Sequence, residues 1–305
     1  MKLLLLLVTS FSLHATTYYV TVAGLGGEPE YEQRFSGWAK DIDKQLHSSA
    51  DSKVDTLYGP DATRAKIQEV FARISREAKP DDVLVLMLIG HGSYDGIDYK
   101  INLPGPDLSA VELGGLLDRV PAKRQLIVNM TSCSGGSRSV LERPNRVVIT
   151  ATKSGSEKNA TIFARYWSEA LRDPSTDVDH NETISALEAF RYAEQKTAKF
   201  FETQKRLATE HAMLEDTGKG EGVRAPSAEN GEGLLAGRLA LLRTGAAETA
   251  ANDPVKRALL AKKDELEQQI DQLKYQKAAL PPDAYKQQLA ALLLELAKTQ
   301  AELDK

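Results

Sequence analysis

The stretch DVLVLMLIGHG, residues 82–92, decides the fold of this chain. Its apolar run is too continuous for a strand with one face in water, so we expect a strand that is buried on both faces and ends just before His91. The stretch RQLIVNMTSCSGG, residues 124–136, repeats the arrangement, with a buried strand at 125–130 that leads to Cys133. One buried strand is therefore followed by a histidine and another by a cysteine.

Parallel strands that end in this way place His91 and Cys133 at the same edge of a sheet. Ligands bind at this carboxyl edge in open α/β sheets. A thiol beside an imidazole pairs a nucleophile with a base, and adjacent glycines leave backbone N–H groups open to an oxyanion. Cys133 is the only cysteine in the chain. The alternative is that His91 caps a loop and Cys133 is a small buried apolar side chain, the commonest role of a free cysteine.

The motifs LIGHG and NMTSCSGG resemble those of the caspase, legumain and gingipain superfamily of cysteine peptidases. The resemblance covers roughly residues 17–245, and these two motifs are its specific part. It implies that His91 and Cys133 form a catalytic dyad. It also implies that the backbone N–H groups of Gly92 and Cys133 stabilise the oxyanion of the tetrahedral intermediate.

The composition and the first residues bound the function. A chain of 305 residues with 42% hydrophobic content can bury one large core and carry an appendage, and a net charge of −4 spread over mixed charges gives no footprint for nucleic acid. Residues 1–15 combine Lys2 with an apolar run that is too short to span a bilayer, which indicates an export signal. We therefore expect a mature chain that is periplasmic or secreted and has no membrane span. A single cysteine in such an oxidising compartment favours a reactive thiol.

Strands and helices alternate along residues 16–245, which predicts one α/β domain with a mainly parallel six-stranded sheet and helices on both faces. The glycines of GLGGE, residues 24–28, are expected to turn the chain from the first strand into a helix. A later helix is expected to run to about Leu214, and a flexible loop to come after it at residues 217–233. We place the sixth strand in GLLAGRLALLR, residues 233–243.

Two segments are expected near the predicted dyad. Asp95 and Gly96 carry hairpin chemistry directly after His91, so this hairpin is either a wall of the substrate cleft or a surface hairpin with no contact to substrate. The strand NRVVITAT, residues 145–152, ends at the same edge. The superfamily resemblance implies that Thr152 and Ser154, in and after its last residues, line the pocket for the residue before the cleaved bond.

The segment DVDHNETISALE, residues 177–188, has the ligand spacing of an EF-hand calcium loop. Glu182 stands at its sixth position, where the sharp turn normally needs glycine. The alternative is an ordinary interhelical loop in which Ser185 and Glu188 form a capping box at the next helix. The residues predicted to hold calcium are Asp177, Asp179, Asn181, Thr183 and Glu188.

Residues 254–305 are predicted to form an antiparallel helical hairpin that turns at Pro281 and Pro282. The second helix carries a heptad seam made of Tyr285, Leu289, Leu292, Leu296, Thr299 and Leu303. Three roles fit such a hairpin: packing on the core, self-association or binding of a partner, and covering the active site.

The sequence therefore predicts an exported cysteine endopeptidase that cleaves proteins or peptides through a thioester acyl-enzyme. The chemistry needs no cofactor, and calcium would be structural. A transamidase or peptide ligase would use the same acyl-enzyme, and a catalytically silent interaction protein is the alternative from another class. The remaining histidines of the mature chain, His47, His180 and His211, are expected to lie away from the strand-end site.

Overall fold

The computed structural model describes residues 15–47 and 52–305. The predicted export signal lies outside these residues except for Ala15, so it stays a prediction. Six strands form the central sheet in the order β10-β8-β7-β3-β1-β2, and all neighbours pair in parallel except β10, which runs antiparallel to β8. The strands are β1 (Thr17–Ala23), β2 (Ser52–Leu57), β3 (Val83–Gly90), β7 (Arg124–Thr131), β8 (Arg146–Thr150) and β10 (Met213–Glu215).

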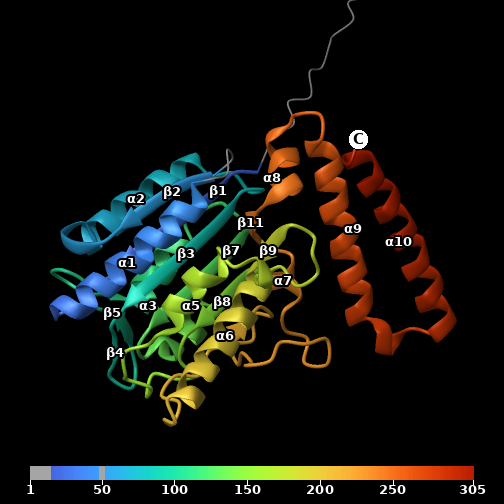
Figure 1. The fold of residues 1–305 in the computed structure, drawn as a ribbon. Coiled ribbons are helices and arrows are strands. Elements are labelled where there is room, and N and C mark those ends of the chain that lie inside the picture. The colour runs from blue at the N-terminus through green and yellow to red at the C-terminus, as the bar shows by residue number, and fades with distance from the viewer. Residues whose placement is uncertain (1–14, 48–51) are drawn as a thin grey trace, which may run out of the picture.

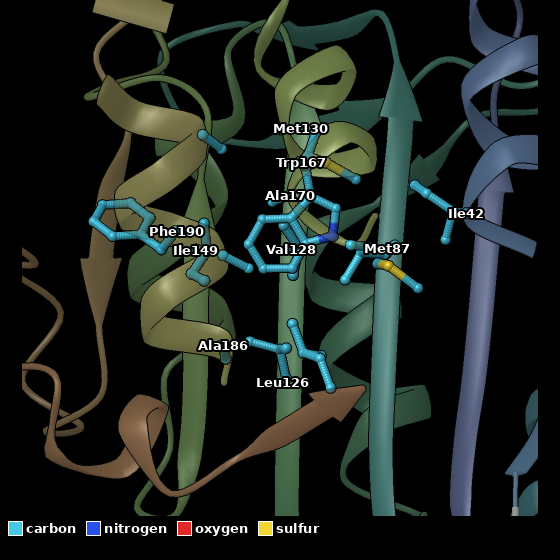
Figure 2. Close-up of a cluster of buried hydrophobic side chains, with 14 of the residues drawn as sticks. Ile42, Met87, Leu126, Val128, Met130, Ile149, Trp167, Ala170, Ala186 and Phe190 are labelled. Atoms are coloured by element: carbon cyan, nitrogen blue, oxygen red, sulfur yellow. The ribbon is translucent and has the colours of Figure 1, made fainter. Parts of the chain in front are cut away.

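Helices cover both faces of this sheet (Figure 1). One face buries apolar side chains of α1 (Pro29–Leu46), α5 (Phe163–Ala170) and α6 (Ala186–Thr203), and Figure 2 shows part of that core around Val128 and Trp167. The other face packs against α2 (Arg64–Glu77) and α3 (Ala110–Leu117). Every residue of β3 is buried, because both of its faces lie under helices. The predicted α/β class and six-stranded sheet are confirmed.

The prediction for the last strand was wrong. Helix α6 ends at Thr203, and Lys205 then takes a left-handed φ of 52°, which stops the helix well before Leu214. The short strand β10 comes next and is the sixth strand. The segment at 233–243 instead forms α7 (Leu234–Gly237) and β11 (Ala240–Arg243), which pairs with β9 (Thr183–Ser185) in a separate sheet.

The C-terminal region is an antiparallel pair of helices, as predicted, with α8 (Gly245–Asn252) leading into α9 (Arg257–Tyr275) and α10 (Pro282–Leu303) (Figure 1). Helix α9 borders a cavity of about 400 Å³ together with Thr17, Val83 and Arg124. These residues begin or lie at the start of β1, β3 and β7, so the hairpin lies at the amino edge of the sheet, not over the carboxyl edge. No helix within the described residues is long and apolar enough to cross a membrane.

Candidate active site

The loops after β3 and β7 leave the sheet together. Gly90 is paired with Thr131 in the parallel register, so both strands end at the same level of the carboxyl edge. Ser132 connects the two loops, because its Oγ accepts a hydrogen bond from the Gly92 N–H at 3.1 Å and lies 3.3 Å from the Gly92 carbonyl oxygen. The structure therefore brings the His91 and Cys133 loops into contact.

The His91 ring is oriented by the segment around the start of α1. It packs edge-on against Tyr31 and Phe35, with ring centroids 4.8 and 5.1 Å away. Burial lowers the pKa of His91, while a hydrogen bond with the Gly26 backbone and the Glu28 carboxylate act in the opposite direction. A lowered pKa favours the neutral imidazole, which is the form that accepts a proton.

Sequence reasoning missed the role of Gly26 in this arrangement. A Cβ at Gly26 would lie 2.4 Å from the backbone nitrogen of Glu32, and the Gly26 N–H donates to Glu32 Oε2 at 2.8 Å. Only glycine fits this close approach. The glycines of GLGGE were the available signal, but the sequence alone could not connect that turn with His91.

Cys133 is held in an unusual backbone conformation. Its φ is 58°, in the left-handed region, and the residue is only 2% exposed. Burial raises the pKa of the Cys133 thiol, and the positive charge of Lys158 lowers it. Within the part of the chain that the structure describes, no hydrogen bond joins this thiol to His91. A thiol with a raised pKa stays protonated at neutral pH, so attack would require a base to remove its proton.

Both backbone amides that were predicted to stabilise an oxyanion already have acceptors. The Gly92 N–H donates to Ser132 Oγ, and the Cys133 N–H donates to the carbonyl oxygen of Glu157 at 2.9 Å. Glu157 belongs to residues 153–158, which come after β8 and lie against the Cys133 loop. We call this segment the covering loop.

The predicted pocket residues pack against the Cys133 loop. Thr152 has no exposed surface, and its Oγ1 accepts a hydrogen bond from the Gly135 N–H at 2.8 Å and lies 3.1 Å from Ser134 Oγ. A Cβ at Gly135 would lie 2.3 Å from the backbone nitrogen of Ser154. A substrate could therefore reach Thr152 only after the covering loop had moved.

The predicted hairpin after His91 is present as β4 (Gly92–Tyr94) and β5 (Tyr99–Ile101). The Tyr94 ring lies over two glycines, since a Cβ at Gly136 or Gly155 would come within 2.7 or 2.2 Å of its ring atoms. This hairpin therefore contacts both the Cys133 loop and the covering loop. Whether this hairpin contacts a substrate stays a prediction.

The expectation that His211 lies away from this site was wrong. The His211 Nδ1 is 2.5 Å from Glu157 Oε1, and the His211 N–H donates to Glu157 Oε2 at 3.2 Å. Because α6 stops at Thr203, the segment before β10 returns past the end of β8, where Met213 pairs with Thr150. The early end of a helix thus brings a distant histidine to the covering loop.

The predicted calcium loop lies beside the cavity at the amino edge. Asp177, Asp179 and Glu188 each offer an oxygen within 4.8 Å of the others, a donor set that suits a hard cation. Glu182 has a φ of 65°, so it adopts the conformation that glycine usually supplies at the sixth position. The capping box between Ser185 and Glu188 is also present. Calcium binding stays a prediction.

Of three comparisons with known proteins, the one with solved structures finds similar chains. No family model matches this chain, and no curated protein matches it. Among solved structures, it is similar to a protein from Geobacter sulfurreducens, with 14% identity, a TM-score of 0.41, and coverage of 60% of this chain and 88% of that one. Caspase-1 from Spodoptera frugiperda shows 14% identity and a TM-score of 0.47, covering 67% and 87%. The Drosophila initiator caspase Dronc shows 10% identity and a TM-score of 0.44, and the match covers 68% of this chain and 81% of Dronc. Likeness at this level carries no argument about activity, which has to be inferred from the geometry of the site.

Proposed function

We propose that this chain is a cysteine endopeptidase in which Cys133 is the nucleophile and His91 is the general base. The observation that carries the proposal is the placement of these two residues directly after β3 and β7, at one edge of the sheet, in loops joined by Ser132. This edge is where open α/β sheets bind ligands. The lowered pKa of His91 supports its role as a proton acceptor.

The reaction begins when His91 takes the proton of the Cys133 thiol and the sulfur attacks the scissile carbonyl carbon. The resulting oxyanion accepts hydrogen bonds from the backbone N–H groups of Gly92 and Cys133, once these are released from their present acceptors. The imidazolium then gives its proton to the leaving amine, and a thioester remains. Water, activated by His91, hydrolyses the thioester and restores the thiol.

A catalytically silent interaction protein is the second candidate. It is favoured by the two amides that are already paired within the protein and by the burial of the Cys133 thiol. A transamidase or ligase is a variant of the first proposal, in which an amine replaces water. The proposal also includes an exported protein, a protein or peptide substrate, and a structural calcium ion.

Substrate profiling of the purified mature chain, with and without calcium, tests the proposal. We expect cleavage of a subset of peptides and covalent labelling of Cys133 by an electrophilic peptide probe. Cys133→Ala should abolish both while leaving the melting temperature within a few degrees. Adding a peptide amine would reveal ligation as a product of higher mass. Cleavage that persists in Cys133→Ala, or a complete absence of cleavage and labelling, would overturn the peptidase assignment and favour the silent protein.

A further inference from the structure

The carbonyl oxygen of Glu157 accepts the backbone N–H of Cys133, one of the two amides that the proposed oxyanion would need. It accepts the Cys133 N–H at 2.9 Å, within the distance at which an oxyanion-hole donor meets its charge. A backbone amide has one proton, so a good hydrogen bond to Glu157 excludes an equally good one to a substrate. The Cys133 amide is thus unavailable while the covering loop stays in this position.

The side chain of the same residue anchors the covering loop. The Glu157 carboxylate accepts hydrogen bonds from the backbone N–H groups of Lys153 at 2.8 Å and His211 at 3.2 Å. Its other oxygen contacts the His211 imidazole at 2.5 Å, and the two side chains are only 18% and 31% exposed. One residue therefore joins the Cys133 amide, through its carbonyl, to the segment before β10, through its carboxylate.

The remaining contacts of the covering loop are weaker. Lys153, Ser156 and Lys158 are exposed, and the Ser154 and Ser156 hydroxyls contact each other. The Lys153 carbonyl accepts from Arg138 at 3.3 Å in an exposed position, and Gly155 lies against the Tyr94 ring. A segment with few buried apolar contacts opens at a low free-energy cost. The Ser154 carbonyl also accepts a hydrogen bond from the Thr152 hydroxyl at 3.1 Å, but the contact between Glu157 and His211 is the one that ties this loop to the segment before β10.

We propose that the covering loop, residues 153–158, is an autoinhibitory element: the contact between Glu157 and His211 keeps the Glu157 carbonyl on the Cys133 amide. Loss of that contact frees the amide and opens access to the thiol. The consequence for catalysis rests on the proposed function. The consequence for thiol access does not, because it is argued only from the burial of Cys133, which is 2% exposed, and from the hydrogen bond between its amide and the loop.

The test uses the full mature chain and the variants Glu157→Ala and His211→Ala. We expect iodoacetamide to alkylate Cys133 about tenfold faster in each variant, the change that removal of roughly 1.4 kcal/mol of restraint produces. The control is His47→Ala, because His47 also contacts a carboxylate, Asp43 at 3.4 Å, but lies at the exposed end of α1. Its alkylation rate should stay within twofold of the unsubstituted chain.

Hydrogen exchange of the peptide that contains Cys133 gives a readout that thiol charge does not affect. The Cys133 amide should exchange faster in both variants, and its exchange rate should be unchanged in the control His47→Ala. The double variant should be no faster than the faster single variant, because both substitutions break the same contact. Glu157→Gln, which keeps the size of the side chain, should show a smaller increase and serves if the alanine variants do not fold.

The outcomes separate this inference from the proposed function. Faster alkylation and exchange without peptide cleavage in any variant would support the autoinhibitory loop and overturn the peptidase. Cleavage by the unsubstituted chain with alkylation and exchange unchanged in both variants would overturn the autoinhibitory loop and leave the peptidase. Purely additive effects of the two substitutions in the double variant would also overturn the autoinhibitory loop.

Discussion

The two edges of the central sheet differ in openness and in chemistry. At the carboxyl edge, Cys133 is buried and the Gly92 and Cys133 amides are paired within the protein. At the amino edge, a cavity of about 400 Å³ lies between the sheet and α9. The proposed nucleophile and base lie at the carboxyl edge, so cavity size does not mark the proposed reactive site. Strand direction does, because parallel strands deliver their following loops to the carboxyl edge.

The cavity at the amino edge is better explained by the way the C-terminal helical hairpin packs against the domain. Its cavity is lined by charged groups of both signs, among them Arg243 and Asp264, which form an ion pair at 2.5 Å. Burial raises the pKa of Glu267 to about 7 and that of Asp179 to about 6. Charged groups of this kind resist close packing of α9 against the domain because burial without full pairing is costly.

The largest expected effect concerns His91, the proposed base at the carboxyl edge. His91→Ala should lower kcat/KM for peptide cleavage by about 10² to 10⁴-fold, because the thiol loses the group that takes its proton. The melting temperature should change little by comparison, and His47→Ala should retain full activity. Steady-state kinetics with a peptide substrate measure the effect. Full activity in His91→Ala would show that another group serves as the base.

The closed edge should also make stability depend on pH through Glu210. This carboxylate is 3% exposed and accepts the N–H groups of Ile162 and Phe163 at the start of α5. Burial raises its pKa from 4.5 to about 7, so the folded state holds a proton that the unfolded state loses between these values. Stability is therefore full below pH 4.5 and falls by up to about 3 kcal/mol as the pH rises through 7.

Glu210→Gln tests this dependence because it removes the titrating proton and keeps one acceptor. The free energy of unfolding, measured in urea from pH 4.5 to 8, should fall less steeply in the variant than in the unsubstituted chain. At the acid end the two should be close. Identical slopes would show that Glu210 does not titrate in this range.

Close packing at the carboxyl edge predicts a third effect. Gly135→Ala should destabilise the protein by about 1–3 kcal/mol, because the new Cβ would meet the backbone of Lys153 and Ser154 at 2.3–2.6 Å. Gly37→Ala in α1 is the matched control, since nothing lies within 4 Å of its Cβ and alanine favours a helix. Thermal melts should move down for the first and slightly up for the second. A tolerated Gly135→Ala would contradict the close packing of this glycine against the backbone of Lys153 and Ser154.

The strand-end positions could be predicted from sequence because they depend on local patterns. Continuous apolar runs identify β3 and β7, and their parallel order brings the residues after them to one edge. The contacts of His211 and Gly26 could not be predicted in this way. They depend on where α6 ends and how the turn after β1 packs, and both are set by tertiary contacts. The strand β10 could not be predicted either, because a strand of three residues is too short to show a periodic pattern.

At the amino edge, calcium is expected to stabilise the protein through the loop at residues 177–188. If the loop at 177–188 binds calcium with a Kd of about 1 mM, 5 mM calcium should stabilise the protein by about 1 kcal/mol. Glu188→Gln should abolish this increment. Glu112→Gln is the control, because Glu112 forms the same kind of capping box with Ser109 in α3 but lies outside the loop. Melting temperatures with and without calcium measure the stabilisation. If calcium still stabilises Glu188→Gln, or does not stabilise the unsubstituted chain, Glu188 acts only as a helix cap.

The smallest effect is expected on the outer face of α10. Leu293 and Leu294 are 48% and 57% exposed, whereas the seam predicted for self-association, including Leu289, Leu292 and Leu296, is half-buried on a helix that packs against α9. Leu294→Ser should therefore change the free energy of unfolding by less than about 0.5 kcal/mol, and Leu266→Ala, on the buried face of α9, by about 2–5 kcal/mol. Neither should alter peptide turnover, because both lie far from the carboxyl edge. Light scattering completes the test: an unchanged mass for Leu294→Ser is expected, whereas a halved mass would assign this outer face, instead of the predicted seam, to self-association.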